Sequence, residues 1–170
     1  AMSLAPPLRY LAGYPAHLVA QVSDCLADGS LGERLRRKYP LPHVVRNDGA
    51  LYAYVGELKA RHLRNAAPLS KVVWDGKLQR VHNALGIHAR VARVQGGQLR
   101  TRREIRIANL FREAPPEFLR MIVVHELAHL KEADHNKAFY QLCQHMEPDY
   151  HQLEFDLRVY LTWRDMQGKP

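Results

Sequence analysis

The sequence is poor in cysteine and contains no long apolar run. Its two cysteines, Cys25 and Cys143, lie far apart in the 170-residue chain and do not form a Cys-x-x-Cys pair. A secreted domain held together by disulfides would carry more of them. The apolar runs are too short to cross a bilayer, and the N-terminal residues lack the basic start and apolar block of a secretory signal. We therefore expect a reducing, cytoplasmic location and no membrane partner.

Acidic residues are also scarce relative to basic ones. The chain has 25 Lys and Arg against 17 Asp and Glu, for a net charge of +8. Such an excess can attract nucleic acid through a basic surface, although solvated surfaces often carry it without a partner. The basic residues occur in two short groups, Arg34, Arg36, Arg37 and Lys38, and then Arg100, Arg102, Arg103 and Arg106.

The first third of the chain has the periodicity of helices. Residues 15–29 place apolar side chains at helical intervals, and Gly29 is a suitable stop. A short helix follows over residues 30–40 and is closed by a proline. Asp48 could cap a third helix that runs to about residue 65. One face of this helix would carry Leu51, Val55, Leu58 and His62.

The middle of the chain alternates with the period of strands. Residues 71–74 and 77–81 flank Asp75-Gly76, the form of a tight hairpin. Residues 88–94 and 98–100 flank a second glycine-containing turn in the same way. The run 103–111 follows, with Ile105 and Ile107 on one face and Arg106 on the other. This pattern predicts an antiparallel sheet of three to five short strands.

The last third returns to helical periodicity. Proline is tolerated in a first helical turn, so the Pro115-Pro116 pair predicts a helix over about 116–131. A second helix is expected over about 137–146, with Asn136 as its cap and with Phe139, Leu142 and Cys143 facing inward. A third is expected over about 149–165. The fold class is therefore α+β. We expect one domain over residues 1–170, with a helical part to about residue 66 and the sheet and catalytic helices in about 67–170.

A His-Glu-x-x-His motif lies in the expected helix 116–131. His125 and His129 are four residues apart, so a helix presents both imidazoles on one face, about 5–6 Å apart at Cβ. Glu126 lies one step round the helix, where it can reach a metal-bound water as a general base. Burying these groups without partners would cost several kcal/mol, and a metal ion would satisfy them together.

A catalytic zinc ion usually has three protein ligands and an open position for water. His135 follows His129 by six residues, and a straight helix would carry it about 9 Å along the axis. The helix must therefore end near residue 131 and the chain must turn back through residues 132–134, before the cap at Asn136. His145, His151 and Glu154 are rival third ligands.

The expected chemistry is hydrolysis, in which Glu126 takes a proton from the attacking water and passes it to the leaving group. The developing negative charge needs a donor besides the metal. Candidate donors are Tyr140, His145, Tyr150, His151 and Arg158. The imidazole N–H groups could donate to Asp134, Asp149 or backbone carbonyls.

The stretch MIVVHELAHLKEADHNKAFYQLCQHMEPDY resembles the YgjP-like family of bacterial zinc-dependent metallopeptidases. The resemblance extends upstream through YLAGYPAHLVAQV, LRRKYP, KVVWDGKLQRVHNALG and RVQGG, and so covers nearly the whole chain. It implies a zincin-like domain related to the SprT-like proteases. It also implies one Zn²⁺ ion held by His125, His129 and His135, with Glu126 as the catalytic acid, and a protein or peptide substrate.

Two other families use the same histidine spacing. Metzincins need glycine where Glu132 stands and a methionine turn that this chain lacks. Some bacterial enzymes that process ribosomal RNA have glycine at the position of Glu126. The expectation is therefore a zinc metallopeptidase. The alternatives are a metalloenzyme directed at nucleic acid, or a basic nucleic-acid-binding module with a metal site.

Overall fold

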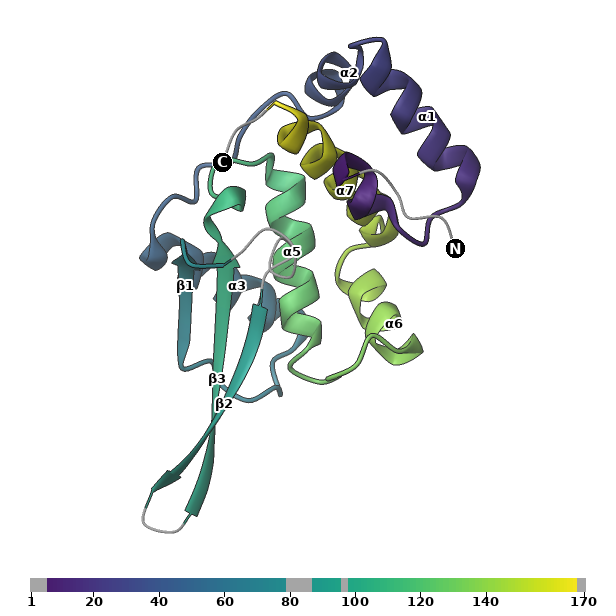
Figure 1. The fold of residues 1–170 in the computed structure, drawn as a ribbon. Helices are drawn as coiled ribbons and strands as arrows, with labels where there is room; N and C mark the ends of the chain where they lie inside the picture. Colours follow the sequence, from purple (N-terminus) through teal and green to yellow (C-terminus); the bar gives the residue numbers. More distant parts are fainter. Residues whose placement is uncertain (1–5, 79–86, 96–97, 168–170) are drawn as a thin grey trace. The chain divides into compact units, whose positions relative to one another are not determined.

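The computed structural model describes residues 6–78, 87–95 and 98–167 (Figure 1). The chain forms two compact units. The first is drawn from residues 1–41 and 151–170, and the second comprises residues 42–150. The expected single domain over 1–170 stays a prediction, and the units are described in turn. No helix in the described part of the chain is both long enough and apolar enough to cross a membrane.

The first unit is helical. It contains the short helix η1 (Pro6–Leu11), α1 (Ala16–Ala27), α2 (Leu31–Lys38) and all but the first residue of α7 (Tyr150–Met166). Gly29 has a positive φ of 79°, which suits glycine just after a helix and confirms the predicted stop of α1. The carboxylate of Asp156 accepts hydrogen bonds from Lys38 and Tyr39 and ties α2 to α7. A core cluster of this unit is formed by the buried residues Leu11, Val22, Leu31 and Val159.

The second unit is built on a three-stranded sheet with the order β1-β3-β2. β2 (Ile87–Gln95) and β3 (Gln98–Ala108) are antiparallel, with Gln95 opposite Gln98, as the second glycine-containing turn predicted. β1 (Lys71–Asp75), however, pairs with β3 in parallel, with Lys71 opposite Glu104. The expectation of a wholly antiparallel sheet was therefore wrong for β1.

β1 is also not paired through the predicted hairpin at Asp75-Gly76. Lys77 and Leu78 are not in a strand, and residues 79–81 of that hairpin lie outside the described residues. β1 instead lies beside the central strand, where Arg106 is paired with Asp75 at 3.1 Å and with Glu104 at 3.2 Å. Alternation in the sequence predicted Ile105 and Ile107 on one face, and both are buried. Alternation carries no information on which strand is the neighbour.

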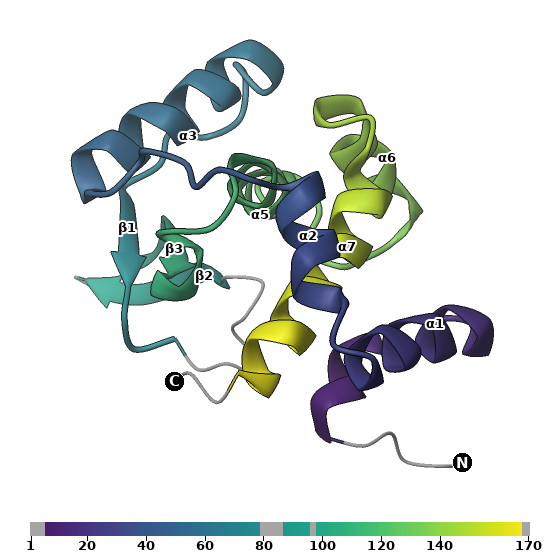
Figure 2. The same cartoon turned by 90° about the horizontal axis from the view of Figure 1, so that it is seen from above.

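Two helices cover the same face of the sheet, as Figure 2 shows. α3 (Asp48–His62) packs on β1, and α5 (Pro116–Ala128) packs on β3 and on α3. α3 begins one residue before the predicted start, because its cap is Asn47, which accepts a hydrogen bond from the Ala50 N–H at 2.7 Å. Asp48 was predicted to cap this helix, but its carboxylate accepts from the backbone N–H of Trp74 instead.

The core of the second unit explains the apolar sequence of α5. Every residue of α5 from Phe118 to Ala128 is buried except Arg120. The predicted inner face of α3 is also confirmed, because Leu51, Val55 and Leu58 are buried. After α5 the chain turns and enters α6 (Lys137–Met146), which ends just before α7. The end of α5 and the start of α6 are the parts of the fold that position the histidines.

Candidate metal centre

Three imidazoles meet where α5 ends. His125 lies in the last turn of α5 and is buried, His129 is the residue that caps this helix and is half-buried, and His135 is exposed beyond the turn. One nitrogen from each ring lies within 4.8 Å of the other two. The Nε2 atoms of His129 and His135 are 3.1 Å apart. The structure thus brings together the three histidines that the sequence singled out.

The chain reversal between α5 and α6 was the step on which the sequence prediction depended. α5 ends at Ala128, three residues earlier than predicted, and backbone N–H groups of Lys131 and Glu132 then donate to the carbonyl of Ala128. At the start of α6, the side chain of Asn136 accepts from the Phe139 N–H at 2.8 Å, as predicted for a cap. The reversal places His135 beside His129, although it contains no glycine.

Glu132 holds this turn, a role that the sequence did not reveal. Its carbonyl oxygen accepts a hydrogen bond from His129 Nδ1 at 2.9 Å, and its carboxylate accepts from the side-chain amide of Asn136 at 3.3 Å. Because a carbonyl can only accept, Nδ1 of His129 carries the proton. In the neutral ring Nε2 then keeps its lone pair, directed toward His135. This is the arrangement expected of a metal-binding imidazole.

His125 is oriented by a hydroxyl group. Its Nδ1 lies 2.8 Å from the hydroxyl of Tyr150, the first residue of α7. Tyr150 is fully buried. The sequence suggested Tyr150 as a donor to developing charge, and Asp134, Asp149 or backbone carbonyls as the partners of the imidazoles. In the structure, the carbonyl of Glu132 is a partner of His129 and the hydroxyl of Tyr150 is a partner of His125.

Phe139 forms an apolar wall against all three imidazoles. The centroid of its ring lies 5.1 Å from that of His125, 4.6 Å from that of His129 and 4.9 Å from that of His135. The helical periodicity of residues 137–146 placed Phe139 on the inward face of α6, but it did not show that this face meets the histidines. An apolar wall restricts water and lowers the local dielectric constant, which strengthens interactions between charged groups.

Glu126 is almost completely buried, with 1% of its surface exposed. One carboxylate oxygen, Oε2, lies 3.9 Å from Nε2 of His125. The other, Oε1, has no hydrogen-bond partner among the described residues. Burial raises the pKa of Glu126 well above its ordinary value. A buried carboxylate with an unsatisfied oxygen is costly, so a cation or a proton donor is expected to lie against this oxygen.

The donor set fits a divalent transition metal. Three imidazole nitrogens converge, two of the rings have their Nδ1 atoms engaged by other groups, and a buried carboxylate lies alongside. Three histidines with one open position are typical of catalytic zinc. A hydrated ion at this point would also satisfy the carboxylate of Glu126. His125, His129 and His135 are therefore the residues that could hold the metal.

The rival residues have other contacts or belong to the other unit. The ring of His145 packs edge-on against that of His62, with centroids 5.7 Å apart. His151, Glu154 and Arg158 lie on the part of α7 that belongs to the first unit, where Arg158 donates to the carbonyl of Tyr10. Tyr140 does lie near the cluster, with its ring centroid 6.4 Å from that of His135. Within the described residues, the three-histidine group includes none of the rival ligands.

Comparison with known proteins identifies the family. The family described as YgjP-like, metallopeptidase domain, matches residues 50–160. The chain belongs to the YgjP-like family. The matched segment contains α5, α6 and the start of α7, and thus all the residues of the candidate site. This match confirms the family resemblance that the sequence showed. It also supports the prediction that the protein is a metal-dependent hydrolase.

A curated relative adds a second finding. The chain is 57% identical over 155 residues to a protein from Escherichia coli (strain K12) that is named UTP pyrophosphatase. The aligned part covers 91% of this chain and 93% of that protein. No solved structure matches the chain. The family name and the name of this relative therefore point to different bonds, one in a peptide and one in a nucleotide.

Proposed function

We propose that this YgjP-like protein is a zinc-dependent hydrolase that splits UTP into UMP and diphosphate. The observation that carries the proposal is the 57% identity, over nine-tenths of both chains, to the protein named UTP pyrophosphatase. Chains this alike along almost their whole length have the same fold and most of the same side chains. A shared substrate class is the simplest expectation, and the peptide substrate expected from the sequence becomes the second candidate.

The candidate site has the parts that this reaction needs. His125, His129 and His135 would hold the Zn²⁺ ion, with Nδ1 of His129 engaged by Glu132 and Nδ1 of His125 by Tyr150. Zinc bound there would lower the pKa of a coordinated water toward about 7 and neutralise charge on a phosphoryl oxygen. Phe139 would keep other water away from the reacting atoms.

Glu126 would move the proton. Beside a divalent cation the ionised carboxylate is favoured, although burial alone disfavours it. Glu126 would accept a proton from the water that attacks the α-phosphorus of UTP. The bond from this phosphorus to the bridging oxygen breaks, the diphosphate group leaves, and the proton passes from Glu126 to the products. One water is consumed for each UMP and diphosphate formed, so the atoms balance.

Peptide hydrolysis is the second candidate, because the family is described as a metallopeptidase domain and His-Glu-x-x-His is typical of zinc peptidases. The same residues would serve it, with Glu126 passing the proton to a leaving amine. The net charge of +8 favours the anionic triphosphate over an average peptide. Because this positive charge could also attract nucleic acid, RNA and DNA are included among the substrates tested.

The deciding experiment compares several substrates and tests the role of Glu126. The zinc-loaded protein is incubated with UTP, and phosphorus NMR is used to detect UMP and diphosphate. Glu126→Gln should retain zinc and lose about 10²- to 10⁴-fold in rate, the usual contribution of a general base. Glu117→Gln, on the same helix but in its first turn, is the matched control.

Other substrates distinguish the remaining activities if UTP is not cleaved. If UTP stays intact while a peptide library is cleaved only when Glu126 is present, the protein is a peptidase. If RNA or DNA is the only substrate cleaved, or if no cleavage depends on Glu126, both proposals are wrong.

A further inference from the structure

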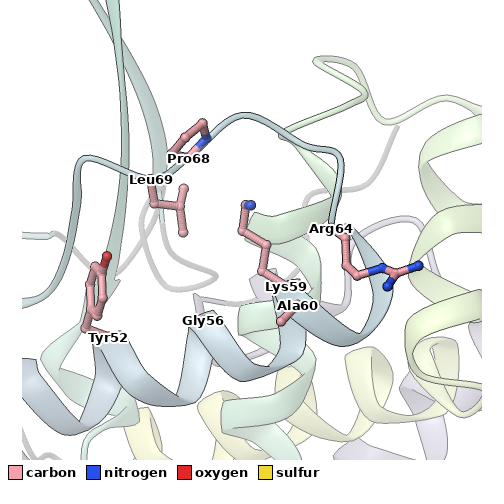
Figure 3. Close-up of a pocket in the computed structure, with 7 residues that line it drawn as sticks. All are labelled: Tyr52, Gly56, Lys59, Ala60, Arg64, Pro68 and Leu69. Carbon is pink, nitrogen blue, oxygen red and sulfur yellow. The ribbon is translucent and has the colours of Figure 1, made fainter.

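A pocket on the outer side of α3 has no role in the site described above. Its cavity volume is about 310 Å³, which is within the range of sites for small molecules. α3 forms one wall, and the chain segment that follows α3 folds over it to form the other (Figure 3). None of the lining residues belongs to the three-histidine group. The lining residues are Tyr52, Gly56, Lys59, Ala60, Arg64, Pro68 and Leu69.

The floor of the pocket is open because residue 56 is a glycine. Gly56 lies in the middle of α3, where glycine destabilises a helix relative to alanine. Its backbone does not require glycine, since positive φ values occur only at Gly13 and Gly29 among the described residues. Close packing does not require it either, because an added Cβ would meet no atom within 4 Å. The effect of Gly56 that the structure does show is to leave space in the pocket.

One end of the pocket is aromatic. Tyr52 lies four residues before Gly56 and therefore on the same face of α3. Tyr52 is 54% exposed, an unusual position for a large ring, and Figure 3 shows its side chain at the edge of the space. Pro68 and Leu69 approach from the segment opposite. A flat ring placed between Tyr52 and Leu69 would cover apolar surface on both of its faces.

The other end is cationic. Lys59 extends into the space in Figure 3, and its ammonium group donates to the carbonyl of Ala66 at 3.0 Å. An ammonium group has three donors, so two are left for a ligand. Arg64 also lines the pocket, but Figure 3 shows its guanidinium group pointing away from Lys59. None of the seven lining residues carries a carboxylate, so this end has an uncompensated positive charge.

We propose that this pocket binds a small aromatic anion of the nucleoside phosphate class, with its ring against Tyr52 and its phosphate at Lys59. Tyr52 and Lys59 are seven residues apart, or roughly 10 Å along the helix axis, which one nucleoside monophosphate can span. The inference does not depend on the proposed hydrolysis, because no lining residue takes part in it. It adds a second ligand site to the protein.

The test is a titration followed at individual backbone amides. Uniformly ¹⁵N-labelled protein is titrated with UMP, uridine or inorganic phosphate. UMP should shift the amide signals of Gly56, Ala60 and Leu69. Binding of UMP at these amides should be at least about tenfold tighter than that of uridine or phosphate. Reading these amides separates the pocket from any nucleotide bound near the histidines.

Variants make the test specific. Gly56→Leu places a side chain over the floor from a Cβ that meets no atom within 4 Å. Its melting temperature should equal or exceed that of the natural chain, because leucine favours a helix over glycine, while UMP binding at the pocket falls at least tenfold. Gly49→Ala changes another glycine of α3, one outside the pocket, and should leave binding as it is. Tyr52→Ala and Lys59→Gln should each weaken binding of UMP.

Three results would overturn the proposal. The first is that the pocket amides do not respond to UMP. The second is that uridine or phosphate binds there as tightly as UMP, because then one end of the pocket contributes nothing. The third is that Gly56→Leu folds and still binds UMP as the natural chain does.

Discussion

His129 and His135 are six residues apart in the sequence, yet their Nε2 atoms lie 3.1 Å apart. A continuous helix would separate these residues by about 9 Å along its axis. The chain closes this gap by ending α5 at Ala128 and beginning α6 at Lys137. The candidate metal centre therefore depends on a turn as much as on a helix, and each part of it can be tested separately.

Tyr150→Phe tests the group that orients His125. The substitution removes only the hydroxyl, which lies 2.8 Å from His125 Nδ1. Loss of such a supporting hydrogen bond typically weakens metal binding by about 10- to 100-fold. We expect this loss of zinc affinity with the fold retained, measured by competition with a chelating dye. Tyr54→Phe, elsewhere in the same unit, is the control. Equal zinc affinity in both variants would mean that Tyr150 does not support the metal.

Asn136→Ala tests the end of the turn. Asn136 and Asn47 both cap helices by accepting from a backbone N–H three residues on, at 2.8 Å and 2.7 Å. Replacing either residue by alanine should lower the free energy of unfolding by about 0.5–2 kcal/mol. Only Asn136 adjoins His135 and bonds to Glu132. We expect zinc affinity to fall in Asn136→Ala and not in Asn47→Ala. The turn would have no role in metal binding if the two variants bound zinc alike.

The parts of the site that depend on local spacing were predictable. His125 and His129 are one helical turn apart, and Asn136 is a strong cap just after His135. Together these signals predicted that the helix must end and the chain return. The resemblance to the YgjP-like family then favoured His135 over its rivals. The position of the helix end was predicted less well, because α5 stops at Ala128, three residues earlier than predicted.

The parts that depend on contacts between distant segments were not predictable. Tyr150 reaches His125 across 25 residues of sequence, and no local pattern indicates this. The parallel pairing of β1 with β3 has the same cause, since alternation fixes the faces of a strand but not its neighbour. Asp48 was mistaken for a cap because its partner, the Trp74 N–H, lies in a strand 26 residues away. Helical periodicity placed Phe139 on the inward face of α6, but its contact with the three imidazoles is visible only in the fold.

Gly32→Ala tests the packing of the first unit. A Cβ at Gly32 would lie 2.6 Å from Nε1 of Trp163, so α7 or the indole ring must shift. Overpacking of this kind costs about 1–3 kcal/mol, against a gain in helix propensity of about 1 kcal/mol or less. Gly56→Ala, where the added Cβ meets nothing within 4 Å, should show the gain alone. Chemical unfolding should rank Gly32→Ala as the less stable variant, and the reverse order would contradict this packing.

Protonation of His43 should lower the stability of the second unit in mild acid. Its ring stacks on that of Trp74, with centroids 5.8 Å apart. Nε2 lies 2.7 Å from the carbonyl of Phe111, and Nδ1 accepts from the N–H of Val45. Burial lowers the pKa of His43 below its ordinary value of 6.5, and Arg46 acts in the same direction, while the bond to Phe111 opposes them. The neutral ring is therefore the form that the fold favours.

The sign of the pH effect follows from this lowered pKa. Between the ordinary value of 6.5 and the lower folded value, the unfolded chain binds a proton at His43 that the folded chain does not. Stability then rises with pH in this window. The contribution of His43 is complete above about pH 6.5 and is lost as the pH falls toward the folded pKa. Urea unfolding of the metal-free protein should show a smaller loss between pH 7.5 and pH 5 in His43→Gln than in the natural chain. His17→Gln, which removes an exposed histidine of α1, is the control. If the loss of stability between pH 7.5 and pH 5 is reduced equally in His17→Gln and His43→Gln, then His43 is not responsible.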